Sequence, residues 1–126
     1  MSKVVLDTDV LIDLLRGRET IRAFLRDVTR DAVPCCSVIS VAELGAGMRP
    51  AEEEPTRALL DTPVIFPVTR EIADVAGRFK RSTRSRRLEL ADCLIAATAF
   101  VEGAVVATGN AKDYPMSEVT VLAARR

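Results

Sequence analysis

Histidine and tryptophan are absent from the 126 residues of this sequence. Without histidine, neither a Ser-His-Asp nor a Cys-His catalytic unit can form, and a zinc site with histidine ligands is excluded. One tyrosine and four phenylalanines leave few rings on which bases could stack, which argues against the aromatic sheet surfaces of proteins that read single-stranded RNA. Any catalysis must therefore rely on other groups.

The chain has three cysteines, and their spacing suits neither a disulfide framework nor a metal site. Cys35 and Cys36 are adjacent and poorly placed to bridge each other, and Cys93 is the odd one. The N-terminal stretch MSKVV is too short for a signal peptide, and no apolar run approaches the length of a membrane span. We therefore expect buried thiols in a soluble cytoplasmic protein with no membrane association.

Length and hydrophobic pattern indicate the fold class. A hydrophobic content of 48% in 126 residues fits a single domain, residues 1–126, and its eighteen basic residues balance eighteen acidic ones. Apolar segments of strand length alternate with segments of helical periodicity, and the strands lack polar alternation. The sequence thus predicts an α/β fold whose parallel sheet is covered by helices on both faces.

The expected elements alternate along the chain. Strands are expected at 3–7, 32–40, 62–68, 104–108 and 119–122. A helix capped by Thr8 or Asp9 should run to Gly17, and others should lie at 19–30, 40–44, 69–84 and 89–103. The polar, proline-containing segment 49–63 is expected to be a loop with a weak helix in its second half. In helix 89–103, the residues expected to face the core are Leu90, Leu94, Ile95, Thr98 and Val101.

Acidic residues occupy ends of several expected elements, and each has a structural explanation. Asp9 fits a helix cap, Glu43 fits a capping box with Ser40, and Asp92 could complement the dipole of its helix. Asp7 lies directly after a buried strand, where α/β sheets bind ligands. Because a parallel sheet would gather Asp7, Glu43 and Asp92 along one edge, we interpret the three together as one site.

Carboxylates that converge repel one another unless a cation lies between them. Hard divalent ions such as Mg²⁺ and Mn²⁺ prefer oxygen ligands of this kind. Without histidine, metal-bound water becomes the natural nucleophile, and a phosphate ester is the substrate suited to this chemistry. The residues alone therefore favour phosphodiester hydrolysis.

Four segments also occur in an order that is typical of one protein family. They are VVLDTDVLIDLLRG, SVISVAELGAG with its glutamate, LELADCLIAATA with its aspartate, and VVATGNAKDYP with a late strand and turn, and they span residues 4–115. In this the chain resembles the PIN-domain ribonucleases and, among them, the VapC toxins of bacterial toxin–antitoxin pairs. The four segments together are far more specific than any one alone.

The resemblance implies a PIN-like (flavodoxin-like) three-layer α/β/α sandwich with a central, mostly parallel sheet. It implies an endoribonuclease that depends on Mg²⁺ or Mn²⁺, cuts RNA and is inhibited by a cognate VapB-type antitoxin. It also implies that Asp7, Glu43 and Asp92 bind the metal. A family-like apolar surface on the first helices would make the protein a homodimer.

The fourth acidic position of the family is ambiguous in this chain. Asn110 stands in the TGN segment, where it can orient a water or accept through its carbonyl but brings no charge. Asp113 could supply the carboxylate, or it could be a turn residue before Tyr114 and Pro115. Thr108 resembles, in its position, a residue whose hydroxyl lies near the metal in members of the family. Both readings of Asp113 stay open at this point.

Residues 78–87, RFKRSTRSRR, form a basic segment without an acidic side chain. It could be a solvated helix end, because cations are favourable near a helix C-terminus. It leads directly into the helix of Asp92, so it could instead hold RNA phosphates by charge and bidentate arginine contacts. The second interpretation assigns RNA binding to Arg81, Arg84, Arg86 and Arg87.

Two other functions are compatible with parts of the sequence. VVLDTDV also fits the opening D-x-D of haloacid-dehalogenase-type phosphatases, in which Asp7 would be the nucleophile and Asp9 the acid–base. That interpretation leaves Glu43 and Asp92 unused and lacks a convincing lysine motif. Alternatively, the domain could be a catalytically inactive binding module of the same fold. Metal-dependent RNA cleavage separates the ribonuclease from both.

Overall fold

The computed structural model of the chain describes residues 2–83 and 88–124. Within them, five strands form one sheet in the order β3-β2-β1-β4-β5, and every neighbouring pair is parallel. The sequence prediction of a mostly parallel sheet is confirmed. The strands are β1 (Ser2–Leu6), β2 (Ala32–Ser37), β3 (Val64–Phe66), β4 (Val105–Thr108) and β5 (Val121–Ala123).

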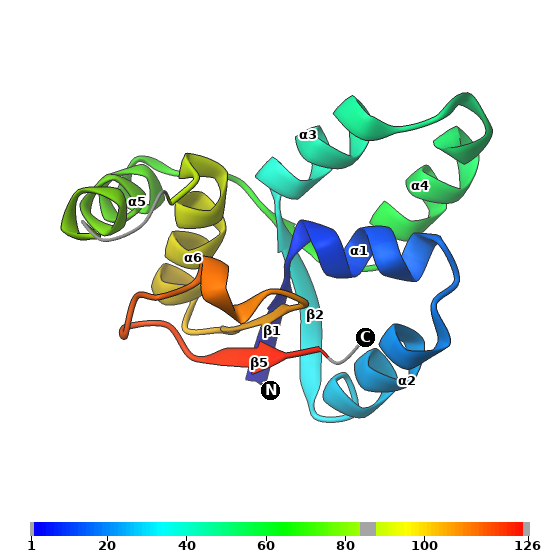
Figure 1. Cartoon of the computed structure of the whole chain (residues 1–126), viewed down its shortest axis with the longest axis horizontal. Coiled ribbons are helices and arrows are strands. Elements are labelled where there is room, and N and C mark those ends of the chain that lie inside the picture. The colour runs from blue at the N-terminus through cyan, green and yellow to red at the C-terminus, as the bar shows by residue number, and fades with distance from the viewer. Residues whose placement is uncertain (1, 84–87, 125–126) are drawn as a thin grey trace.

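Helices connect the strands and cover both faces of the sheet, which makes the predicted three-layer sandwich (Figure 1). One side carries α5 and α6, and the other carries α1 and α2, with α3 and α4 beyond the carboxyl ends of β1 and β2. The helices are α1 (Thr8–Leu15), α2 (Glu19–Val28), α3 (Val38–Gly47), α4 (Glu53–Leu60), α5 (Arg70–Ser82) and α6 (Leu90–Glu102). Short 3₁₀ turns lie at Pro50–Glu52 (η1) and Ala111–Asp113 (η2).

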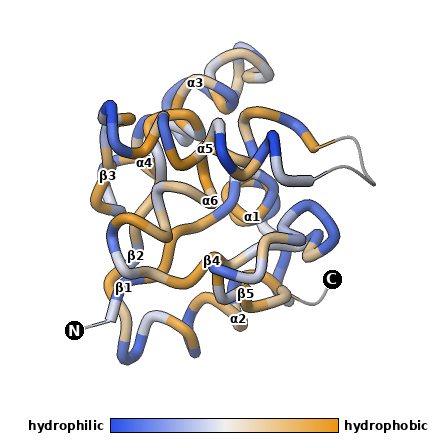
Figure 2. Tube along the Cα trace, turned by 90° about the vertical axis from the view of Figure 1, so that its left-hand side faces the viewer, coloured by the Kyte–Doolittle hydropathy of each residue, from blue (hydrophilic) through white to orange (hydrophobic). Residues whose placement is uncertain are grey.

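Alternate residues of the strands supply two cores. Val5 and Cys35 pack with α5 and α6, whereas Val4, Leu6 and Cys36 pack with α1 and α2. Figure 2 shows hydrophobic stretches along the central strands and alternating hydrophilic and hydrophobic turns along the outer helices. The sheet is therefore buried on both faces, as the continuous apolar strands predicted.

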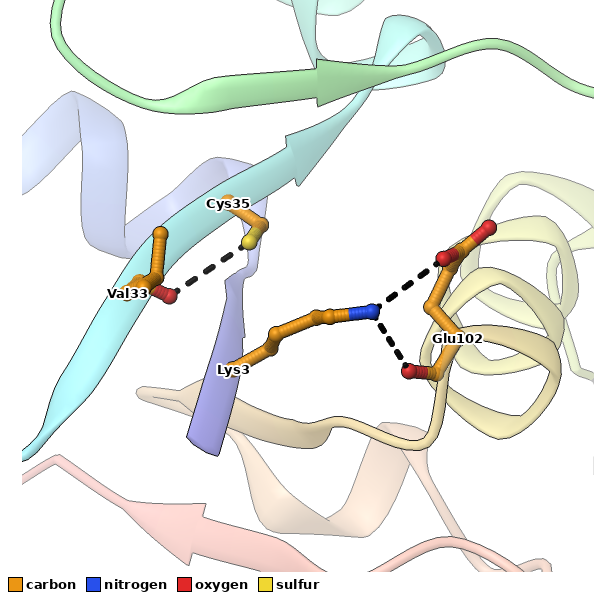
Figure 3. A network of polar contacts seen from close by, with 4 residues as sticks. All are labelled: Lys3, Val33, Cys35 and Glu102. Atoms are coloured by element: carbon orange, nitrogen blue, oxygen red, sulfur yellow. Dashed lines mark hydrogen bonds and ion pairs between the residues drawn. The ribbon is translucent and has the colours of Figure 1, made fainter. Parts of the chain in front are cut away.

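The cysteines are buried free thiols, as expected. Burial raises the pKa of Cys36 to about 11, so its thiol stays protonated at neutral pH. At the start of β1, opposite the end that carries Asp7, Lys3 donates to the carbonyl and the carboxylate of Glu102, 3.2 and 3.5 Å away, beside Cys35 (Figure 3). This ion pair ties the end of α6 to β1.

Three details of the predicted elements are wrong. The cap of α1 is Asp7, because its carboxylate accepts from the Thr8 N–H, so neither Thr8 nor Asp9 has that role. Helix α3 begins at Val38 with Ser37 as its cap, which ends the strand earlier than expected and removes the capping box of Ser40 and Glu43. Leu90, the first residue of α6, is 52% exposed and does not face the core, whereas the core is entered from Cys93 onward.

The segment 49–63 is also more regular than expected. The 3₁₀ turn η1 leads into α4, which contains Pro55 in its first turn. Proline is tolerated there because the first N–H groups of a helix have no intrahelical partner. Among the helices within residues 2–83 and 88–124, none combines the length and apolar character needed to cross a membrane.

Candidate active site

The predicted acidic residues lie where the strand order reverses. Both β2 and β4 flank β1, so the crevice beyond the carboxyl ends of β1 and β4 is the switch point of the sheet. Asp7 follows β1 directly, and its N–H donates to the carbonyl of Ala107 in β4, 2.9 Å away. Thr108 ends β4 beside it. The register of the two strands therefore places Asp7 and Thr108 together.

Asp7 is held by donors to both of its oxygens. Its Oδ1 accepts from the Thr8 N–H at 2.7 Å, and its Oδ2 accepts from the Thr108 hydroxyl at 2.7 Å. Burial, followed by the negative charge of Asp9, raises the pKa of Asp7 to about 6, although the hydrogen bonds from the Thr108 hydroxyl and the Thr8 N–H lower it. The carboxylate is thus fixed in direction but costly to ionise.

Glu43 reaches the site from the middle of α3. Its Oε1 accepts from the Thr8 hydroxyl at 2.6 Å, and the Thr8 and Ser40 hydroxyls are 2.8 Å apart. Thr8 and Ser40 are both buried, so their linked hydroxyls hold the Glu43 carboxylate at the pocket that Asp7 also lines. The sequence prediction missed Thr8 and Ser40 as site residues, because each had a role as a helix cap. The sequence carries no signal for Thr8, which lies 35 residues from Glu43, and the position of Ser40 three residues before Glu43 indicated only the capping box.

Asp92 lies in the first turn of α6, as predicted. Burial raises its pKa to about 7, together with the charges of Asp7, Asp113, Glu43 and Glu89 in that order. Repulsion of this kind requires the carboxylates to share a confined space. The structure therefore brings Asp7, Glu43 and Asp92 into one cluster.

The ambiguous fourth position is shared by two side chains in the structure. The amide nitrogen of Asn110 donates to Oδ2 of Asp113 at 3.1 Å, and the 3₁₀ turn η2 holds the pair. The Asn110 N–H also donates to the Thr108 hydroxyl at 3.0 Å. Asp9 is close as well, since its Oδ1 accepts from the Gly109 N–H at 3.3 Å. Asp9 is thus part of the site wall.

These side chains line an open pocket of about 390 Å³, formed by Asp7, Thr8, Asp9, Ile12, Glu43, Asp92, Asn110 and Asp113. Its carboxylate and amide oxygens are the ligands that Mg²⁺ and Mn²⁺ prefer, so the donor set fits a hard divalent cation. Within residues 2–83 and 88–124, no three His, Cys, Asp or Glu side chains are arranged to enclose an ion unaided. This is compatible with Mg²⁺, which usually binds through one or two carboxylates, waters and substrate phosphates.

Comparison with known proteins assigns the family. The PIN domain family matches residues 4–119. The chain belongs to the PIN-domain family. It is 41% identical to "Ribonuclease VapC10" of Mycobacterium tuberculosis over 117 residues, which cover 91% of this chain and 88% of that protein. "Ribonuclease VapC19" of the same organism is 34% identical over 115 residues, covering 89% and 92%.

Solved structures share the fold of this PIN domain. A toxin–antitoxin complex from Klebsiella pneumoniae contains a chain that is 26% identical, with a TM-score of 0.81 and 98% coverage of both chains. VapBC2 from Rickettsia felis, bound to a DNA fragment from its promoter, contains a chain with a TM-score of 0.79, 19% identity and coverage of 95% and 97%. The family resemblance and the fold inferred from the sequence are confirmed.

The family argues against the phosphatase, one of the interpretations that the sequence left open. The haloacid-dehalogenase-type interpretation left Glu43 and Asp92 without a role, whereas the pocket of this PIN domain contains both. Of the four arginines predicted to bind RNA, Arg81 lies exposed in the last turn of α5. Arg84, Arg86 and Arg87 lie outside the described residues.

Proposed function

We propose that this PIN domain, acting as a single domain over residues 1–126, is a metal-dependent endoribonuclease in the cytoplasm and the toxin of a toxin–antitoxin pair. One observation carries the proposal: five acidic side chains line one open pocket at the switch point of the sheet, namely Asp7, Asp9, Glu43, Asp92 and Asp113. The relatives named as VapC ribonucleases support RNA as the substrate.

Asp7, Glu43 and Asp92 would hold the cation, one or two of them directly and the rest through waters, and we propose that it is Mg²⁺ or Mn²⁺. When bound, it supplies an activated water at neutral pH and offsets charge on a phosphodiester. Thr8 and Thr108 keep the Glu43 and Asp7 carboxylates in place through bonds of 2.6 and 2.7 Å. The Asn110 side-chain amide donates to the Asp113 carboxylate and holds it at the pocket. There the Asp113 carboxylate can orient water or a substrate hydroxyl.

A toxin needs a partner that restrains it. The chains of similar fold come from complexes described as VapBC or toxin–antitoxin complexes, some of them bound to DNA. We therefore propose a cognate VapB-type antitoxin for this chain. The homodimer expected from the sequence stays a prediction, which sedimentation of the purified protein would check.

Expression of the chain alone should arrest growth of a bacterial host, because uncontrolled RNA cleavage stops protein synthesis. Co-expression of a small protein encoded beside it should restore growth. The Asp7→Asn variant, produced at the same level, is the control and should be harmless. If the parent protein cuts RNA in solution but leaves growth unaffected, the toxin assignment is wrong.

The basic segment 78–87 offers a test of substrate binding. If Arg81, Arg84, Arg86 and Arg87 hold RNA phosphates, replacing all four with Gln should weaken RNA binding across sequences. In a plot of the logarithm of the affinity against the logarithm of the salt concentration, the slope should become shallower by about one unit per lost contact. Titrations of a catalytically inactive parent and the quadruple variant at several salt concentrations measure both effects.

A matched control variant loses the same number of positive charges as the quadruple variant, but outside the basic segment. Four exposed arginines outside the segment can be replaced with Gln: Arg22, Arg26, Arg30 and Arg57. This control variant should retain the salt dependence of its parent. If the two quadruple variants behave alike, the basic segment is only a solvated helix end, and RNA is positioned by other residues.

A further inference from the structure

The turn that carries Asn110 and Asp113 to the pocket lies at the surface, beyond the end of the sheet. Strand β4 ends at Thr108, and the side chains of Asn110, Ala111 and Lys112 that follow are exposed. Exposed segments with few buried apolar contacts are the parts of a protein that open most readily. The position of the turn therefore depends on how its two ends are held.

The far end of the turn is held by packing. Tyr114 and Met116 follow Asp113, and both are buried in the core beneath α5 and α6. Within the turn, the Asn110 N–H donates to the Thr108 hydroxyl and the Asp113 N–H donates to the Asn110 carbonyl, each at 3.0 Å. These two bonds are local, so they shape the turn without joining it to another element.

At the near end, Asp9 joins the turn to α1. Its Oδ1 accepts from the Gly109 N–H at 3.3 Å, although the two residues are 100 positions apart in the sequence. Helix α1 already has its cap in Asp7, so Asp9 is not needed for that role. Asp7 also fixes the start of α1 to the end of β4, because its Oδ2 accepts from the Thr108 hydroxyl. Asp9 thus holds the turn from a well-anchored helix end.

We propose that Asp9 is a positioning residue whose carboxylate holds the Gly109 N–H and thereby keeps Asn110 and Asp113 at the pocket for RNA cleavage. This inference rests on the proposed function, because it presumes that Asp113 acts on water or a substrate hydroxyl. Two other roles for Asp9 need its charge: complementing the dipole of α1 and binding the cation directly. A neutral side chain that keeps an oxygen acceptor separates the proposed role from both.

The test compares two neutral variants, Asp9→Asn and Asp9→Ala. Both lose the charge, but asparagine keeps an oxygen that can accept from the Gly109 N–H. In NMR of the metal-free protein without RNA, this N–H should exchange with water roughly fivefold to tenfold faster in Asp9→Ala than in Asp9→Asn, as the loss of one hydrogen bond predicts.

Cleavage of one RNA by the same proteins shows whether the bond matters for the reaction. At saturating Mg²⁺, kcat of Asp9→Ala should be at least about tenfold below that of Asp9→Asn, because misplaced catalytic groups lower the rate of the chemical step. The KM values of the two variants should agree within about twofold, since an interaction that acts in the transition state affects kcat. Asp31→Ala is the matched control, because Asp31 is exposed, lies outside the pocket and carries the same charge. It should cut RNA like the parent.

Unfolding midpoints of all variants establish that they are folded at the assay temperature. Asp9→Leu has nearly the shape of Asp9→Asn without an acceptor, and it should behave like Asp9→Ala in both measurements. The inference is overturned if Gly109 exchanges equally in the Asn, Ala and Leu variants, or if these variants cut RNA equally well. A parent that cuts no RNA would overturn the proposed function, whereas exchange of the Gly109 N–H still decides whether Asp9 holds the turn.

Discussion

Replacing Asp7 with asparagine should lower the rate of Mg²⁺-dependent RNA cleavage by at least about a hundredfold, since even partners of metal ligands contribute about tenfold to a hundredfold. The fold should persist. Asparagine caps helices about as well as aspartate. Its side-chain oxygen can still accept from the Thr8 N–H, which lies 2.7 Å from Oδ1 of Asp7 in the parent protein. Its amide can donate to the Thr108 hydroxyl, which now donates to Asp7.

Initial rates on one RNA at saturating Mg²⁺, with circular dichroism of both proteins, measure this effect. Asp27→Asn is a matched control, because Asp27 lies exposed in α2 and pairs with Arg30 on the surface. Its cleavage rate should stay within about twofold of the parent, since such surface pairs contribute little. A folded Asp7→Asn protein that cuts RNA at the parent rate would show that the acidic cluster is not the active site.

The metal-free protein should lose thermal stability as the pH rises from 5 to 8. The pKa of Asp92 is raised to about 7 and that of Asp7 to about 6, against an ordinary value of 3.8. Between about pH 4 and pH 7, the folded state therefore binds more protons than the unfolded state, and stability falls with increasing pH. We expect the unfolding midpoint to drop by roughly 3 to 6 °C over this range, which corresponds to about one kcal/mol or somewhat more.

One substitution and one added ligand should each reduce this pH dependence. Asp92→Asn removes the carboxyl group with the higher pKa, so the variant should be more stable than the parent at pH 8 while losing cleavage. Saturating Mg²⁺ should also raise the midpoint of the parent at pH 8, because the cation binds the folded state preferentially. Fluorescence-monitored melting at several pH values, with EDTA or Mg²⁺, gives these midpoints. A midpoint that is independent of pH and of Asp92 would contradict the electrostatic account of the pocket.

The sequence predicted much of the site because strand topology places Asp7 at a known position. A buried parallel strand ends at Asp7, and helix α6 begins just before Asp92, so both residues follow from the alternation of strands and helices alone. Glu43 lines the pocket with them, and the metal-binding role that the family resemblance implies for it stays a prediction, whereas the local explanation, a capping box, was wrong. Ser37 takes the cap, which leaves Glu43 free to reach Thr8.

Two of the positioning hydroxyls could not be predicted from the sequence. Thr8 and Ser40 come from distant segments, and only tertiary packing shows that the Thr8 hydroxyl contacts both the Glu43 carboxylate and the Ser40 hydroxyl. In the same way, local sequence cannot decide whether Asn110 or Asp113 lines the pocket. The turn η2 brings in both, because the Asn110 amide bonds to the Asp113 carboxylate.

The most direct test of the central claim is incubation of the purified chain with total RNA, in Mg²⁺ and in EDTA, followed by mapping of the new RNA ends. The proposed function predicts internal cuts that vanish in EDTA, return when excess Mg²⁺ or Mn²⁺ is added, and are absent from the Asp7→Asn protein prepared in parallel. Cleavage that persists in EDTA, or equal cleavage by both proteins, would contradict it. So would intact RNA after incubation with folded parent protein that binds Mn²⁺.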